Sequence, residues 1–159
     1  MSKAAWAVRA AFVTNGLGVG AIYARIPDIK EKYALSNAQV GTILLCASLG
    51  VLFAIPRAGK VTALKGSRPV VIAASYMGAL TTIPIALAPN YLTICIAFVF
   101  WGSVLTTQDV AMNTHASTVE HEEKRRYMSG FHAVFSLGAL SGGFLGGLAS
   151  QFKISLIAQ

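Results

Sequence analysis

The feature that most constrains this chain is a series of long apolar stretches, each close to the ~20 residues that a helix needs to cross a bilayer. Five such stretches occur, at about residues 5–24, 40–56, 69–88, 91–112 and 128–152. They are expected to be helices, because unpaired backbone amides are costly in hydrocarbon and strands would have to close into a barrel. With 55% apolar and 12% charged residues, the chain also departs from soluble domains. The sequence therefore predicts an all-α membrane protein with five transmembrane helices.

The positive charges predict how these helices are oriented. Of the 13 lysines and arginines, nine fall on the side of the N-terminus and four on the opposite side. The nine are Lys3, Arg9, Arg57, Lys60, Lys65, Arg68, Lys124, Arg125 and Arg126. Because cytoplasmic loops carry an excess of lysine and arginine, we expect a cytoplasmic N-terminus in the cell's inner (plasma) membrane. The net charge of +7 then reflects topology and attraction to anionic lipid, and no basic run interleaved with aromatic residues indicates a nucleic-acid partner.

Catalytic and cofactor chemistry finds no support in the sequence. We find no metal-ligand spacing, no nucleophile-elbow motif and no paired aspartates of the lipid-headgroup transferase kind. Cys46 and Cys95 both fall within apolar stretches, where a free cysteine behaves as a small apolar residue. We therefore expect no catalytic residue, no cofactor and no metal.

A family resemblance becomes specific in the segment from Gly59 to Arg68, between the second and third apolar stretches. This segment resembles the loop signature of the major facilitator superfamily, which has a glycine, three residues, an aspartate, then a glycine and basic residues. In such a loop, glycines allow a tight turn and charges hold the helix ends in one conformer. The resemblance implies a gating role for Gly59, Gly66 and Arg68. Ala63 stands where the aspartate is expected, so the acidic half of this lock is missing.

Three further segments resemble a sugar- or fucose-permease-like branch of the same superfamily, and the match covers essentially the whole chain. They are Arg25 to Lys30, Asp109 to Asn113, and Phe131 to Gly138. The resemblance implies two six-helix halves that rock about a midplane site, each half holding nested three-helix inverted repeats. It also implies that this chain matches the N-terminal half alone, one helix short, since Lys153 to Gln159 would only begin a sixth helix.

The leading functional hypothesis is therefore a secondary transporter of a small polar or sugar-like solute, working by alternating access. The expected partners are the solute, the lipid bilayer and a second polypeptide that would supply the remaining helices of a truncated or partial copy. Two alternatives stay open. One is a non-transporting membrane subunit or nonfunctional fragment, and the other is a membrane-embedded enzyme.

Polar residues inside the apolar stretches are the candidates for binding the solute, because they are costly in lipid and normally face a cavity or a partner. Asn15 lies ten residues into the first stretch, ~15 Å deep and hence near the midplane. It is expected either to contact substrate or to bond a neighbouring helix. His132 lies ~8 Å into the last stretch, at a depth similar to Asp109. It is a candidate for substrate or proton binding, although an interhelical hydrogen bond is favoured.

A polar stripe is expected on the fourth helix. Gly102, Thr106, Asp109 and Asn113 recur at helical spacing and share one side of it. Asn113 is a candidate substrate contact. Asp109, however, lies ~27 Å along the helix from Tyr91, close to the cytoplasmic face. We therefore favour a structural and gating role for Asp109, paired with Arg68 or another base, over substrate or proton chemistry.

Small residues on the last helix predict close packing. Gly138, Gly142 and Gly146 recur every four residues and form a ladder of the kind that allows two helices to approach closely. The surrounding glycine-rich segment also resembles the superfamily's antiporter signature. Its proline is replaced by Gly143, so the sequence does not support antiport.

Two charged segments lie between the apolar stretches. Arg25 and Pro27 end the first helix, and Asp28 and Glu31 follow. An interfacial charge cluster that anchors this helix is favoured over a substrate gate. The mixed-charge segment 120–126 is interpreted as a solvated turn.

Overall fold

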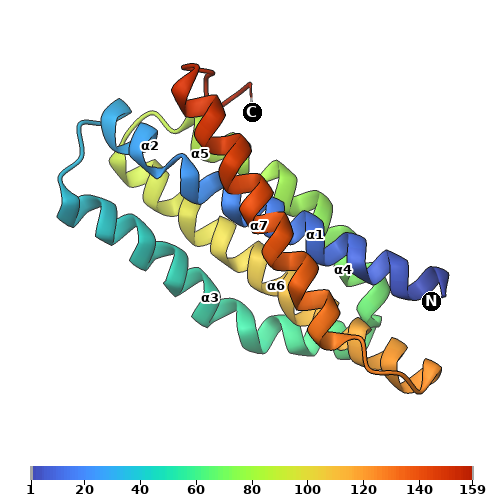
Figure 1. Cartoon of the computed structure of the whole chain (residues 1–159). Helices are drawn as coiled ribbons and strands as arrows, with labels where there is room; N and C mark the ends of the chain where they lie inside the picture. Colours follow the sequence, from blue (N-terminus) through green and yellow to red (C-terminus); the bar gives the residue numbers. More distant parts are fainter. Residues whose placement is uncertain (1, 159) are drawn as a thin grey trace.

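The computed structural model describes residues 2–158, and within that range it contains seven helices and no strand (Figure 1). The helices are α1 (Lys3–Ala24), α2 (Ile26–Lys32), α3 (Asn37–Lys65), α4 (Ser67–Leu80), α5 (Thr82–Leu87), α6 (Tyr91–Glu123) and α7 (Met128–Gln151). Because α2 continues α1 and α5 continues α4, they form five segments long and apolar enough to cross a membrane. The predicted all-helical fold with five spanning segments is confirmed.

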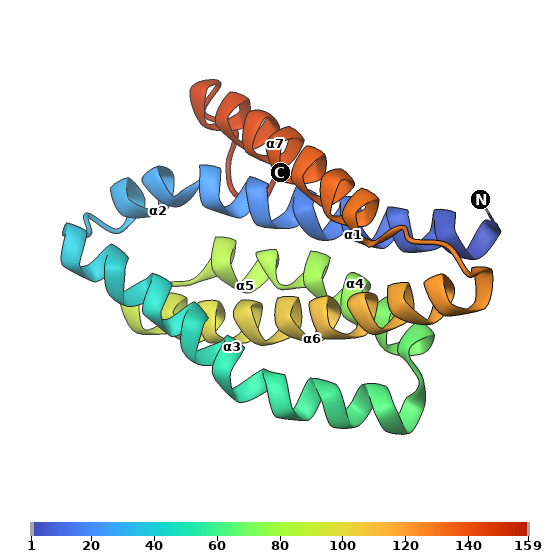
Figure 2. The ribbon, with the colours of Figure 1, turned by 60° about the horizontal axis from the view of Figure 1, so that its bottom comes forward.

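Proline explains where two of these segments break. Pro27 and Pro84 each lack an N–H group, and their rings clash with the carbonyl four residues earlier. Accordingly α1 ends at Ala24 and α4 ends at Leu80, each just before the short helix that contains the proline. Pro56 lies inside α3, which stays helical through it but bends along its length (Figure 2).

The helices run past the apolar stretches from which they were predicted. The expected inner loop from Gly59 is instead the last turns of α3, and α6 continues to Glu123. At the end of the bundle that holds the N-terminus, the connections that remain are Gly66 and residues 124–127. The physical reason is that lysine, glutamate and alanine have helix propensities at least as high as those of apolar residues. A helix therefore need not end where the hydrocarbon ends.

Glycines bring α1 and α7 into backbone contact along what we call the α1–α7 seam. A Cβ atom at any of five positions would collide with the backbone of the facing helix, and these are Gly16, Gly20, Gly138, Gly142 and Gly146. The two from α1 face α7, and the three from α7 face α1. In lipid, where the hydrophobic effect between helices is lost, such close approach supplies van der Waals attraction.

The α3–α6 seam is built in the same way. A Cβ on Gly50 would collide with the Val99 carbonyl oxygen, and one on Gly102 with the Ala47 carbonyl oxygen. The Ser103 hydroxyl adds a hydrogen bond of 3.2 Å to the Gly50 carbonyl oxygen. The bundle is thus two closely joined pairs, with α6 lying between α3 and the α1–α7 pair (Figure 2).

Two apolar clusters fill the space between the pairs, one toward each end of the bundle. The cluster at the end that holds the N-terminus includes Phe12, Met112 and Phe131. The cluster at the opposite end includes Ile43 and Phe98. We call these ends the N-terminal end and the C-terminal end of the bundle. The two clusters fix the helices that carry the polar side chains described below.

Oxidation of the two cysteines is expected to cross-link α3 to α6. Cys46 lies four residues before Gly50, and Cys95 lies four residues before Val99, so both are one helical turn from the backbone contact of Gly50 with Val99. The two thiols are close enough to interact. On treatment with copper(II) phenanthroline, the two thiols should lose their two protons and pass one electron to each of two Cu(II) ions, forming the S–S bond. Polyethylene-glycol maleimide should then label neither thiol until dithiothreitol is added. Cys46→Ser should keep one label, and two persistent labels in the parent would contradict this helix register.

Candidate functional site

A group of polar side chains from α6 and α7 forms the strongest candidate for a solute site. Asp109 and Asn113 come from α6 and His132 from α7. Asp109 and His132 are exposed, and the carboxylate lies within electrostatic range of the imidazole. The Asn113 amide donates hydrogen bonds to Asp109 Oδ1 at 3.1 Å and to the Asp109 carbonyl oxygen at 2.9 Å. We call Asp109, Asn113 and His132 the polar triad.

Phe12 from α1 fixes the position of the histidine. Its ring meets the His132 ring edge to face, with 5.2 Å between centroids, and stacks on Phe131 at 5.6 Å. Phe12 and Phe131 are fully buried. Edge-to-face aromatic contacts have a preferred geometry and restrict the ring. The imidazole is therefore held against the α1–α7 seam, with its exposed side free for hydrogen bonding.

The polar stripe predicted on α6 is divided between two environments. Gly102 belongs to the α3–α6 seam, and the buried Thr106 hydroxyl is satisfied by the Gly102 carbonyl oxygen at 2.8 Å. Asp109 and Asn113 alone continue onto the open surface. The environments differ because α3 and α6 cross. Toward the N-terminal end, α3 no longer covers this side of α6.

Within residues 2–158, no ion pair joins Asp109 to Arg68, the pairing expected from the sequence. Arg68 is an exposed residue in the first turn of α4, and the titratable side chain beside it is His115. The Nδ1 atom of His115 lies 3.1 Å from the Ser67 hydroxyl. The rotation of α4 about its own axis thus directs its first turn toward a different part of α6.

Asn15 lies inside the bundle. The residue is 5% exposed, and among residues 2–158 its Nδ2 atom has no hydrogen-bond partner. A buried amide without a partner is costly. Among residues 2–158, the hydrogen bond to a neighbouring helix that was one of the two roles expected for Asn15 is therefore not formed by its Nδ2 atom.

The two glycines of the expected inner loop differ in role. Gly66 has a φ of 83°, in the region that L side chains rarely adopt, and forms the turn between α3 and α4. Gly59 is an ordinary residue of α3, and no atom of another element lies within 4 Å of where its Cβ would be. The turn therefore depends on Gly66 alone.

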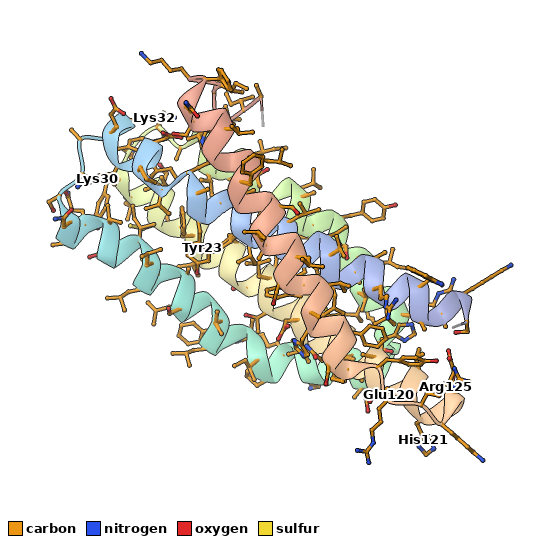
Figure 3. All side chains as sticks on the ribbon, in the orientation of Figure 1. Tyr23, Lys30, Lys32, Glu120, His121 and Arg125 are labelled. Atoms are coloured by element: carbon orange, nitrogen blue, oxygen red, sulfur yellow. The ribbon has the colours of Figure 1, made fainter. Side chains whose placement is uncertain are left out.

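Several residues that join the helices were not singled out from the sequence. Gln108 is 3% exposed and donates a hydrogen bond of 3.0 Å to the Ser75 hydroxyl, joining α6 to α4. Its position as a polar residue in an apolar stretch was the available signal. Tyr23 meets Trp101 edge to face at 5.8 Å and faces the surface between α3 and α7 (Figure 3). No pattern in either helix alone indicated that contact.

At the C-terminal end, Arg25 is the centre of a buried ionic network. The residue is 3% exposed, so it is not the interfacial anchor expected from the sequence. Its Nε atom lies 2.5 Å from Asp28 Oδ2, and Nη2 donates to the Ile154 carbonyl oxygen at 2.5 Å. The Ser150 hydroxyl donates to Asp28 Oδ1 at 2.6 Å. This network connects the end of α1 to α2, α7 and the segment that follows α7.

At the N-terminal end, segment 120–126 is more structured than a solvated turn. The Glu120 carboxylate accepts hydrogen bonds from the backbone N–H groups of Tyr127 and Met128 and so caps α7. The Tyr127 hydroxyl donates to Glu123 Oε2 at 2.7 Å. This bond raises the pKa of the Tyr127 phenol above its ordinary value. Glu120, His121 and Arg125 project at this end, whereas Lys30 and Lys32 project at the other (Figure 3).

Comparison with known proteins gives a consistent result. The family model described as Major Facilitator Superfamily matches residues 10–157. An uncharacterized MFS-type transporter of Yersinia pestis is 35% identical over 148 residues, which cover 93% of this chain and 38% of the relative. An uncharacterized transporter of Sinorhizobium fredii is 32% identical over 146 residues, covering 92% of this chain and 39% of the relative.

A third relative has a less specific description. The membrane protein MosC of Rhizobium meliloti is 32% identical over 136 residues, which cover 86% of this chain and 33% of the relative. This chain therefore spans between 33% and 39% of the length of these three relatives. No solved structure shows a significant match.

Proposed function

The chain belongs to the Major Facilitator Superfamily, and on that premise we propose that it takes part in secondary transport of a small polar, sugar-like solute by alternating access. We further propose that it lies in the cell's inner membrane with its N-terminal end in the cytoplasm. The excess of lysine and arginine at that end supports this orientation. Its relatives are described as transporters, which favours transport over the enzyme hypothesis.

The polar triad is the observation that carries this proposal. Carboxylate, amide and imidazole groups within spanning helices, here toward their cytoplasmic ends, are costly unless they face water, a partner or a solute. Here two of the three side chains are exposed, and together they offer hydrogen-bond donors and acceptors within a small area. Such an arrangement suits a solute with several hydroxyl groups. The carboxylate and imidazole also make a proton a reasonable coupling ion.

We propose that further helices complete the transport path, because the relatives are more than twice as long as this chain. Those helices would come from the rest of a longer chain or from a second polypeptide. A groove between α1, α5 and α7, with Leu17, Ile85 and Leu145 among its lining residues, offers an apolar surface for one of them. Apolar side chains and small residues are what a transmembrane helix packs against.

Asp109→Asn and His132→Ala are each expected to lower solute uptake at least about tenfold, which corresponds to loss of ~1.4 kcal/mol of interaction with the solute or its coupling ion. The measurement is uptake of radiolabelled hexoses and pentoses into proteoliposomes, with and without a proton gradient. Thr114→Val is the matched control, because Thr114 is an exposed polar residue of α6 whose hydroxyl bonds the Val110 carbonyl oxygen.

The outcomes separate the hypotheses. Saturable uptake that the two triad variants reduce and the control retains would support transport through this site. Uptake that appears only with a second polypeptide carrying further helices would show that the chain is a subunit rather than a carrier by itself. Saturable uptake with both triad variants unaffected would remove the triad from the solute path.

A further inference from the structure

Tyr23 places a half-exposed aromatic ring on the same face of the bundle as the polar triad. The residue belongs to α1, points to the surface between α3 and α7 and is 51% exposed (Figure 3). Its ring meets Trp101 of α6 edge to face, and Trp101, itself 3% exposed, lies against the buried Phe98 with 5.6 Å between ring centroids. Two buried rings therefore hold the Tyr23 ring in place, while the rest of its surface stays open.

Tyr23 does not lie where an interfacial tyrosine would lie. Tyrosines that anchor a span in the headgroup region are found at its ends. Tyr33, which follows α2, and Tyr91, which begins α6, hold that position here, and each hydroxyl bonds a carbonyl oxygen of another segment. Trp101, the partner of Tyr23, lies ten residues along α6 from Tyr91, ~15 Å from that end. Tyr23 is thus an aromatic side chain within the spanning part of the bundle.

The distance between Tyr23 and the polar triad is longer than one sugar ring. Phe12, which contacts His132, precedes Tyr23 by 11 residues on α1, so the two share one side of the helix and lie about 16 Å apart along it. On α6, Trp101 and Asp109 are eight residues apart, or ~12 Å. One hexose ring is too short to touch both places at once, whereas two linked rings can span them.

The surface between the two places carries no charge. The stretch of α6 from Trp101 to Gln108 contains no charged residue, and neither does α7 after His132 or α3 as far as Pro56. A charged solute would lose its hydration there without gaining a counterion, which is costly. Exposed hydroxyls such as that of Ser136, one turn after His132, can bond a neutral solute instead. The region therefore suits an uncharged solute with several hydroxyl groups.

We propose that the solute is a neutral disaccharide, with one ring stacked on Tyr23 and the other hydrogen-bonded by the polar triad. This inference rests on the function proposed above and adds the size of the solute and a second point of contact. The face of an aromatic ring is electron-rich, so it attracts the C–H groups on one side of a sugar ring. Carboxylate, amide and imidazole groups bind the hydroxyls of the other ring.

The proposal is tested by measuring sugar binding and tryptophan fluorescence in the same protein. The chain contains two tryptophans, so Trp6→Phe leaves Trp101 as the only one. Maltose, cellobiose, lactose and sucrose are titrated beside glucose, galactose and fructose, and affinities are measured by equilibrium dialysis of the radiolabelled sugars. At least one disaccharide should bind more tightly than its own monosaccharides. That disaccharide should change the emission of Trp101, because it covers the ring that Trp101 contacts.

Substitutions at Tyr23 separate stacking from binding at the triad. Tyr23→Ala should weaken binding of that disaccharide about tenfold and leave its monosaccharides unaffected, a loss within the range of aromatic contacts. Tyr23→Phe keeps the ring and should bind like the parent. The matched control is Tyr76→Ala, because Tyr76 is also an exposed tyrosine of a spanning segment, on α4. This control should bind the disaccharide like the parent.

The outcomes distinguish this inference from the proposed function. Unchanged disaccharide affinity in Tyr23→Ala, or an equal loss in Tyr76→Ala, would overturn the inference, and uptake that still falls in Asp109→Asn would leave the proposed function supported. Disaccharides that bind no more tightly than their monosaccharides would overturn it as well. Disaccharide binding that depends on Tyr23 without any uptake would support the aromatic contact and contradict transport by this chain. Absence of binding by every sugar would overturn both.

Discussion

Gly142→Ala is expected to destabilise the bundle by about 2–3 kcal/mol, because overpacking at a rigid contact forces a backbone shift. The new Cβ would collide with the Leu17 carbonyl oxygen of α1. A backbone carbonyl cannot move aside as a side chain does. The two helices would therefore have to separate along the α1–α7 seam. Unfolding in sodium dodecyl sulfate, followed by circular dichroism, measures the change.

Gly147→Ala is the matched control for this prediction. Gly147 lies on the same helix, and no atom of another element lies within 4 Å of where its Cβ would be. Since alanine favours helix over glycine by about 1 kcal/mol, this control should be neutral or slightly stabilising. Equal stability of the two variants would show that the seam is not in backbone contact.

Arg25→Met is expected to cost about 3–5 kcal/mol, since it leaves a partly buried carboxylate without its counterion. The Asp28 side chain is 24% exposed and is held 2.5 Å from Arg25 Nε. The same substitution also frees the Ile154 carbonyl oxygen from Nη2. The segment after α7 should then detach, and limited proteolysis at Lys153 should become faster. The free energy of unfolding and the cleavage rate can be measured on the same sample.

A double-mutant cycle separates the charge from the packing. Asp28→Asn combined with Arg25→Met should lower the free energy of unfolding by less than the sum of the two single changes. The double variant has neither charge of the pair, so it leaves no charge without a partner. Lys30→Met is a control at the same end, since Lys30 is exposed and, within residues 2–158, its ammonium bonds the exposed Asn37. Strict additivity in the cycle would mean that Arg25 stabilises the bundle through its aliphatic part.

The number and kind of helices could be predicted from the sequence because the bilayer imposes a length on apolar stretches. The helix ends could not. Lys60 and Lys65 are too polar to count as membrane residues, yet they are good helix formers, and α3 continues through them. The glycine spacing in α7 predicted close packing, but no property of one helix identifies its partner. That Gly16 and Gly20 of α1 face α7 in return required the structure.

The site was harder to predict for the same reason. Polarity identified Asp109, Asn113 and His132 as candidates, and their depth along each helix placed Asp109 near His132. Depth does not determine rotation. The rotation of α4 decides that Arg68 lies beside His115 and not beside Asp109. Similarly, the charge of Arg25 was evident, whereas its burial depends on Ile154, which lies far away in the sequence.

Where two helices meet backbone to backbone, no rotamer is available to absorb sliding. The α1–α7 and α3–α6 seams are joined in this way, so each pair should behave as a rigid body. Any rearrangement within the bundle would then take place between the α1–α7 pair and the α3–α6 pair, where aromatic side chains that can tilt make the contacts. Tyr23 against Trp101 is one such joint, and the space between His132 and Asp109 is another. Under the function proposed above, a solute bound by His132 and Asp109 would contact both rigid pairs at once.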